Sequence, residues 1–227
     1  MKSITFSDFK QHFYKKVSDV SLFDCAEFNI TKVVLEGLQL DYVSKGVIRT
    51  PVFWPIFLYK FYIFIKRTLS KKILSDINLP KNQKIFIYDT ARAVQNQKDE
   101  WVHYRYHSII EYYGRDHCFI MLDKDDQRLD YDVSFQRLQN QSNIKELSKD
   151  DIQLIKQVKQ TLRKIKRSGL FTMNDLENIK IACQLFFDQY RVFQPFFLNS
   201  DIKTAHFDGH YHREGLMLAL KRNKVNA

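Results

Sequence analysis

Glycine and proline are scarce in this chain, with six glycines and four prolines among 227 residues. Tight turns depend on these two residue types, so their scarcity disfavours a β-rich fold with many turns and favours helices. The three cysteines, Cys25, Cys118 and Cys183, are odd in number and far apart in the sequence. This pattern excludes a disulfide framework and a CxxC metal site, and it is typical of a reducing, intracellular compartment.

Several motifs that mark well-known sites are also missing from the sequence. Without a GxGxxG or Walker motif, a classical dinucleotide or ATP site is not supported, and we expect no cofactor. Without a GxSxG motif, a Ser-His-Asp hydrolase is not supported either. The first ten residues lack the apolar run of a secretory signal, so we expect a cytoplasmic protein.

The charge is strongly one-sided, at a formal net value of +10. Such a charge favours acidic partners, including anionic lipid and phosphorylated small molecules. Nucleic acid is not an expected partner, because the sequence has no arginine-rich tail, RNP-like aromatic motif or zinc finger.

The most apolar segment covers residues 51–65 and is followed directly by a basic run. Its uninterrupted apolar pieces are shorter than the ~20 residues that a membrane-spanning helix needs. Two interpretations stay open. The segment is a buried helix, or it lies in the plane of the inner face of the plasma membrane. In the second case Trp54 and Phe57 enter the headgroup region, while Lys66 and Arg67 meet anionic lipid.

The pattern of the sequence changes near residue 80. Residues 1–79 carry apolar side chains at three- and four-residue spacing, which predicts a helical, aromatic and basic leader. From there on, apolar runs at 84–88 and 118–122 flank a helical pattern at 104–113. Non-alternating apolar strands around a helix are typical of a βαβ unit in a parallel sheet. We therefore predict an α/β fold for residues 80–227, a Rossmann-like parallel sheet flanked by helices, with a helical N-terminal extension.

Further elements are expected in the second half of the chain. The sequence Ser148-Lys-Asp-Asp151 has the character of a capping box and opens an amphipathic helix. The next helix is predicted to begin within 172–175 and to end before Pro195. A strand at 202–207 and a helix from residue 213 complete the predicted fold.

Polar residues gather where the predicted strands end. In a parallel sheet, ligands bind outside the carboxyl ends of the strands, and three such ends lie at 89–92, 123–124 and 206–214. Polar residues at these positions can also simply cap helices and line solvated loops. The last segment contains four residues of metal-ligating type: His206, Asp208, His210 and His212. None of them lies on a helix at a fixed ligand spacing, so we expect no metal site.

Residues 209–222, Gly-His-Tyr-His-Arg-Glu-Gly-Leu-Met-Leu-Ala-Leu-Lys-Arg, resemble a segment of bacterial surface-polysaccharide glycosyltransferases with two Rossmann-like domains. In that family, a polar loop with an acidic residue precedes a helix of the type LALIAAAKKLGI, and a strand with a QHG motif follows. Residues 85–90, 108–114 and 118–122 are similar to the family's opening strand, helix and second strand.

The resemblance implies the N-terminal, acceptor-side part of a glycosyltransferase of capsule or lipopolysaccharide synthesis. Such an enzyme moves a sugar from a nucleotide-sugar donor to a lipid-linked or saccharide acceptor. The QHG motif and the second domain, which would supply most donor contacts, do not follow in this sequence. We therefore expect part of a longer enzyme, a truncated gene product or a degenerate copy, inactive by itself.

The resemblance also implies roles for individual residues. The implied catalytic residues are Asp89, His210 and Glu214. The implied substrate-binding residues are Arg92, His206, Asp208, His212 and Arg213. The alternative function is a non-catalytic module that binds a membrane surface or a partner through residues 54–72.

The membrane hypothesis predicts that replacing both Trp54 and Phe57 by Ser weakens binding to anionic vesicles, because the aromatic rings would supply the apolar contact with lipid. Co-sedimentation with vesicles measures the effect, and circular dichroism of both proteins serves as the control. A variant that loses its folded spectrum would instead place the segment in the protein core.

Overall fold

The computed structural model of the protein describes residues 33, 80–90, 93–142, 148–169, 171, 173–208 and 213–227. The described helices and strands fall into two compact units. One unit contains α6 (Lys149–Arg167) and the first part of α7 (Met173–Leu198), as far as Phe187. The other unit contains the sheet and the remaining elements. The predicted helical extension and its boundary near residue 80 fall outside the described residues.

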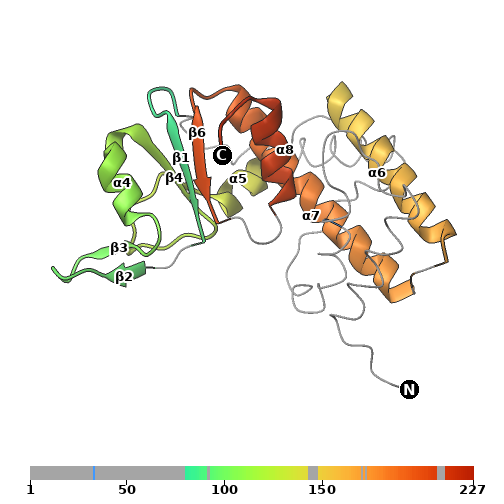
Figure 1. Ribbon diagram of the computed structural model, residues 1–227, viewed down its shortest axis with the longest axis horizontal. Coiled ribbons are helices and arrows are strands. Elements are labelled where there is room, and N and C mark those ends of the chain that lie inside the picture. The colour runs from blue at the N-terminus through green and yellow to red at the C-terminus, as the bar shows by residue number, and fades with distance from the viewer. Residues whose placement is uncertain are drawn as a thin grey trace, which may run out of the picture. The chain divides into compact units, whose positions relative to one another are not determined.

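The sheet has four strands, all parallel, in the order β5-β4-β1-β6 (Figure 1). These strands are β1 (Ile85–Asp89), β4 (Cys118–Leu122), β5 (Val133–Ser134) and β6 (Thr204–Phe207). If these four strands are numbered 1 to 4 along the chain, their order across the sheet is 3-2-1-4. This is the strand order of a doubly wound fold. The predicted α/β fold with a Rossmann-like parallel sheet is confirmed.

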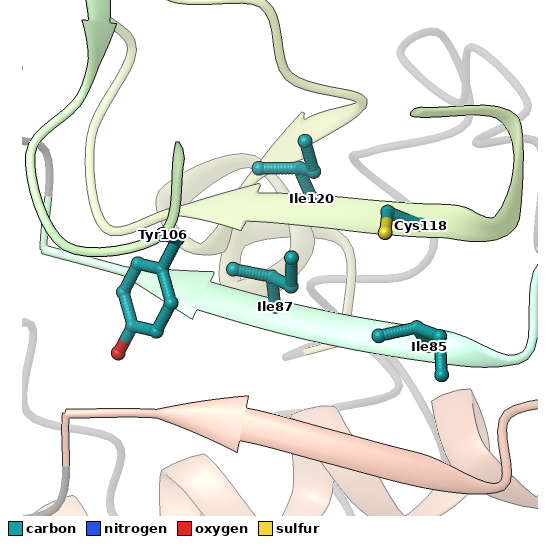
Figure 2. Close-up of a cluster of buried hydrophobic side chains, with 5 residues drawn as sticks. All are labelled: Ile85, Ile87, Tyr106, Cys118 and Ile120. Carbon is teal, nitrogen blue, oxygen red and sulfur yellow. The ribbon is translucent and has the colours of Figure 1, made fainter. Parts of the chain in front are cut away.

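The central strands are buried along their whole length, and their side chains alternate between the two faces of the sheet. On one face lies a cluster of five buried residues, drawn in Figure 2: Ile85, Ile87, Tyr106, Cys118 and Ile120. Helix α4 (His107–Tyr113) packs against this cluster through Ile109, Ile110 and Tyr113. The apolar runs of the strands therefore reflect burial on both sides, as the parallel arrangement requires.

Aromatic rings fill the opposite face. The ring of Phe86 contacts Phe193, Phe196 and Phe197 of α7, with ring centroids 5.2 to 6.1 Å apart. The helix α5 (Phe135–Ser142) joins this layer, because the Phe135 ring stacks on Phe193 at 5.3 Å. Helices thus cover both faces of the sheet.

The predicted end of α7 before Pro195 is wrong, because the helix continues through this proline to Leu198. Proline lacks the N–H that an interior helical position would donate. Two of the three ring contacts that α7 makes with Phe86 come from Phe196 and Phe197, immediately after the proline. Burial of these rings offsets the missing hydrogen bond.

The segment after β1 also differs from the prediction. Residues expected to form a polar loop instead form a hairpin of β2 (Ala93–Gln95) and β3 (Trp101–His103). In its turn, the Asn96 side chain accepts hydrogen bonds from the backbone of Lys98 and Glu100. Helix α4 consequently begins at residue 107, and it ends at Gly114, whose φ of 83° suits glycine.

In the other unit, the predicted capping box at the start of α6 is confirmed. The Ser148 hydroxyl accepts from the Asp151 amide at 3.1 Å, and the Asp151 carboxylate accepts from the Ser148 amide at 2.8 Å. The last turn of α6 carries Lys164, Lys166 and Arg167, and cations at this end interact favourably with the helix dipole.

The last helix, α8 (Glu214–Arg222), begins where the sequence predicted. It packs beside α7, since Asn223 donates from its side chain to Gln194 at 3.1 Å. The chain then returns to the sheet, where Asn226 forms a parallel bridge with Thr204 of β6. Among the described helices, none is long and apolar enough to cross a lipid bilayer.

Truncating the ring at the centre of the aromatic layer tests this packing. We expect Phe86→Ala to lower the free energy of unfolding by about 3–5 kcal/mol, because a fully buried ring leaves a cavity. Urea denaturation measures the change. Tyr112→Ala, at a ring that is 81% exposed, should change it by less than about 1 kcal/mol. Similar losses for both variants would contradict the described core.

Candidate functional site

The order of the strands fixes where a site is expected. From β1 the chain crosses to β4 on one side, and it later returns to β6 on the other side. At such a switch point the loops after the two central strands diverge and leave a binding position at the carboxyl edge. Tyr88 lies beside Phe207 in the register, so Asp89 and Asp208 leave the sheet at neighbouring positions. Two carboxylates of the predicted site therefore meet at the switch point.

The Asp89 carboxylate is buried and paired with His103 of the hairpin. The Asp89 Oδ2 and His103 Nδ1 atoms are 2.8 Å apart, and the two residues are 2% and 5% exposed. The other ring nitrogen, Nε2, lies 2.9 Å from the backbone carbonyl of Asp130. Both ring nitrogens of His103 therefore face an oxygen atom that can accept a hydrogen bond. The pair ties β1, the hairpin and the loop after β4 together.

The second carboxylate, Asp208, is more accessible. It forms an ion pair with Arg105, and the two side chains are 18% and 43% exposed. The backbone carbonyl of Asp208 also accepts a hydrogen bond from Arg213 Nε at 3.4 Å. Of the two carboxylates, Asp208 is thus the one that solvent and ligands can reach.

Arg213 and Tyr88 form a second buried group on the other side of β1. The guanidinium lies 4.2 Å from the ring centroid of Tyr88, and its Nη1 donates to the hydroxyl at 3.2 Å. The hydroxyl in turn donates to Asp123 at 2.6 Å. Burial raises the pKa of Tyr88; Arg213 opposes this shift and Asp123 adds to it. The hydroxyl therefore keeps its proton and links the ends of β1, β4 and α8.

The hydroxyl of Tyr106 is influenced by the charged residues described above. Figure 2 shows Tyr106 beside the arrowheads of β1 and β4, at the carboxyl edge. The pKa of Tyr106 is raised to about 12, chiefly by burial and also by the negative charges of Asp89 and Asp208, against Arg105 and Arg213. The hydroxyl therefore keeps its proton at neutral pH.

Two other predicted residues lie around this place. His206 is in β6, and its ring lies 5.8 Å from that of Tyr113 on the α4 face. Its Nε2 atom is buried and has no hydrogen-bond partner among the described residues. Glu214, one of the implied catalytic residues, is buried, at 6%. As the first residue of α8, its carboxylate lies at the positive end of the helix dipole, which stabilises it there.

The remaining predicted residues lie outside the described residues: Trp54, Phe57, Lys66, Arg67, Arg92, His210 and His212. Their roles in catalysis, substrate binding and membrane contact stay predictions.

The sequence prediction missed the three residues that pair with or surround the carboxylates: His103, Arg105 and Tyr106. The missed signal was the hairpin. Residues 93–95 and 101–103 are short strands around a turn at Asn96, a residue type that favours turns by bonding its own backbone. Recognising it would have placed His103 on a strand that returns toward the end of β1.

The described residues of the site offer paired charges and hydroxyl groups. Within the described part of the chain, no group of three His, Cys, Asp or Glu side chains could hold a metal ion. The site offers carboxylate acceptors and guanidinium donors at one edge, which suits a ligand with several hydroxyl groups.

Comparison of the chain with protein-family models, with curated proteins and with solved structures gives no match.

Replacing Tyr106 tests the buried environment of its hydroxyl group through the dependence of stability on pH. Tyrosine has an ordinary pKa of 10.0, against about 12 for folded Tyr106, so between these values the unfolded chain loses the proton first. Stability contributed by the proton is present below pH 10 and is lost as the pH rises toward 12. We expect Tyr106→Phe to lose less stability than the unaltered chain between about pH 9 and about pH 11.

Urea midpoints at the two pH values measure the difference. The control is Tyr112→Phe, at an exposed ring, which should follow the unaltered chain. Equal pH dependence in all three proteins would show that Tyr106 is not held in the environment described.

Proposed function

We propose that residues 80–227 form the acceptor-side part of a glycosyltransferase that moves a sugar from a nucleotide-sugar to a saccharide or lipid-linked acceptor. The observation that carries the proposal is the group of charged residues at the switch point of a parallel sheet, where Asp89 pairs with His103 and Asp208 pairs with Arg105. This is where α/β folds bind small ligands. The resemblance of residues 209–222 to surface-polysaccharide glycosyltransferases, in the loop and helix that follow β6, supports the same assignment.

The ion pair of Asp208 and Arg105 is suited to hold an acceptor sugar. A carboxylate accepts hydrogen bonds from hydroxyl groups, and a guanidinium donates to their oxygen atoms. Vicinal hydroxyl groups of one sugar ring can therefore use both partners together. Hydrogen bonds to charged groups contribute about 1.5–3 kcal/mol each, enough to position a polar ligand.

In the proposed reaction, a base takes the proton of the acceptor hydroxyl as its oxygen attacks the sugar of the donor, and cations stabilise the departing diphosphate. Asp208 contacts the acceptor, while the buried Asp89–His103 pair holds the surrounding loops in place. Under the resemblance, the donor binds mainly to a second Rossmann-like domain. His210 and His212 follow Asp208 closely in the sequence. We propose that they contact the acceptor or the diphosphate.

Glycan binding by the full chain tests this function. We expect the chain to bind oligosaccharides on an array of bacterial surface-polysaccharide fragments. Asp208→Asn should weaken that binding about tenfold, because it removes a charged acceptor of hydrogen bonds. Asp116→Asn is the matched control, since this exposed aspartate precedes β4 and lies at the opposite edge of the sheet.

Absence of glycan binding, or equal binding by both variants, would count against the proposed function. Thermal unfolding of the two variants shows whether a loss of binding comes from a loss of fold.

A further inference from the structure

An exposed tryptophan lies on the same strand as His103 of the buried Asp89–His103 pair. Trp101 is 44% exposed, whereas His103, two residues further along β3, is 5% exposed. Side chains two residues apart point to the same side of a strand, so the indole ring and the buried imidazole share one side of the hairpin. Because His103 is bound to Asp89 at the end of β1, Trp101 is carried to the carboxyl edge of the sheet.

The indole ring of Trp101 also packs against a cationic side chain. The guanidinium of Arg128, in the loop after β4, lies 5.0 Å from its centroid. Asp126 fixes this guanidinium through hydrogen bonds to Nε at 2.9 Å and Nη2 at 2.7 Å. The hairpin and the loop are therefore joined a second time, through the contact of the exposed ring with this guanidinium.

The loop after β4, which carries Arg128, is bound to the sheet by hydrogen bonds. Arg115 donates to the Asp130 carboxylate at 2.7 Å and to the Cys118 carbonyl at 2.8 Å. The Asp132 carboxylate accepts from the Ile120 amide at 2.7 Å. An aromatic ring on such a support can bind a ligand with little further loss of conformational freedom.

We propose that Trp101, supported by Arg128, is a stacking subsite for one pyranose ring of the acceptor saccharide. The subsite rests on the proposed function, and it extends that function by naming a residue that selects the ligand. A pyranose ring has an apolar face of C–H groups, and the negative face of an indole ring attracts such groups. The charge of Arg128 is paired with Asp126, so the subsite attracts the sugar ring itself rather than an anionic group.

The position of the subsite fits an extended saccharide. Trp101 lies on the hairpin that follows β1, and the Asp208–Arg105 pair lies at the end of β6 and just after that hairpin. The sugar that reacts occupies the charged pair, and a neighbouring sugar of the same chain lies on the indole ring. Trp101 therefore contributes affinity and selects acceptors longer than one sugar.

The test uses the indole ring as its own reporter. The chain has two tryptophans, Trp54 and Trp101, so in Trp54→Phe the emission comes from Trp101 alone. This variant of the full chain is titrated with the oligosaccharide that gives the strongest signal on the glycan array. We expect a saturable change of Trp101 emission, larger for a tetrasaccharide than for its monosaccharide unit.

Binding variants complete the test. Trp101→Ala should weaken binding on the array about tenfold, and Trp101→Phe, which keeps an aromatic face, should weaken it less. Tyr112→Ala removes another exposed ring and should leave binding unchanged. If Trp101→Ala does not fold, Trp101→Phe and the emission titration still decide the matter.

The two proposals fail in different ways. Binding that is weakened by Asp208→Asn but unaffected by Trp101→Ala, with no change of emission, overturns the stacking subsite and leaves the proposed function intact. If no oligosaccharide binds the unaltered chain, the proposed function and the subsite are both overturned.

Discussion

The buried pair of Asp89 and His103 holds three segments at one edge of the sheet: the end of β1, the β2–β3 hairpin and the loop after β4. A lone carboxylate in this position would lose its hydration without compensation. With the imidazole ring beside it, the charge is paired and both ring nitrogens have oxygen partners. Removing either member would leave the other buried and unpaired, so the arrangement of the edge depends on both being present.

The positions of Arg105, Tyr106 and Trp101 follow from this pair. All three lie within three residues of His103: Trp101 is on the same strand, and Arg105 and Tyr106 are in the short connection between β3 and α4. Once His103 is bound at the end of β1, Arg105 can reach Asp208 and Tyr106 can enter the core beside Ile87 and Ile120. The same interaction therefore supports the proposed sugar contact, the cluster of charges and the stacking ring.

Much of the fold could be predicted from the sequence because its signals are local. The strand at Cys118–Leu122 is an uninterrupted apolar run, and the start of α6 is marked by a capping box within four residues. The hairpin was missed because each of its strands has only three residues, too few to show a period. Pro195 misled the prediction because its cost is offset by ring contacts with Phe86, which lies far away in the sequence.

Only the carboxylates of the candidate site could be predicted from the sequence, and their partners could not. Asp89 and Asp208 could be found, since carboxylates directly after apolar runs mark the ends of parallel strands. Their partners depend on pairing across 14 residues for His103 and 103 residues for Arg105, and no local pattern encodes this. Glu214 was placed correctly at the start of α8, but its burial depends on how the helix packs.

The charges of the edge balance one another. Asp89, Asp123 and Asp208 face His103, Arg105 and Arg213. These pairs contrast with the whole chain, which carries a formal charge of +10. Opposite charges held close together have little joint field beyond the Debye length of about 8 Å at physiological salt. Selection at these pairs therefore depends on contact: on shape, on hydroxyl geometry and on the fit of a ring.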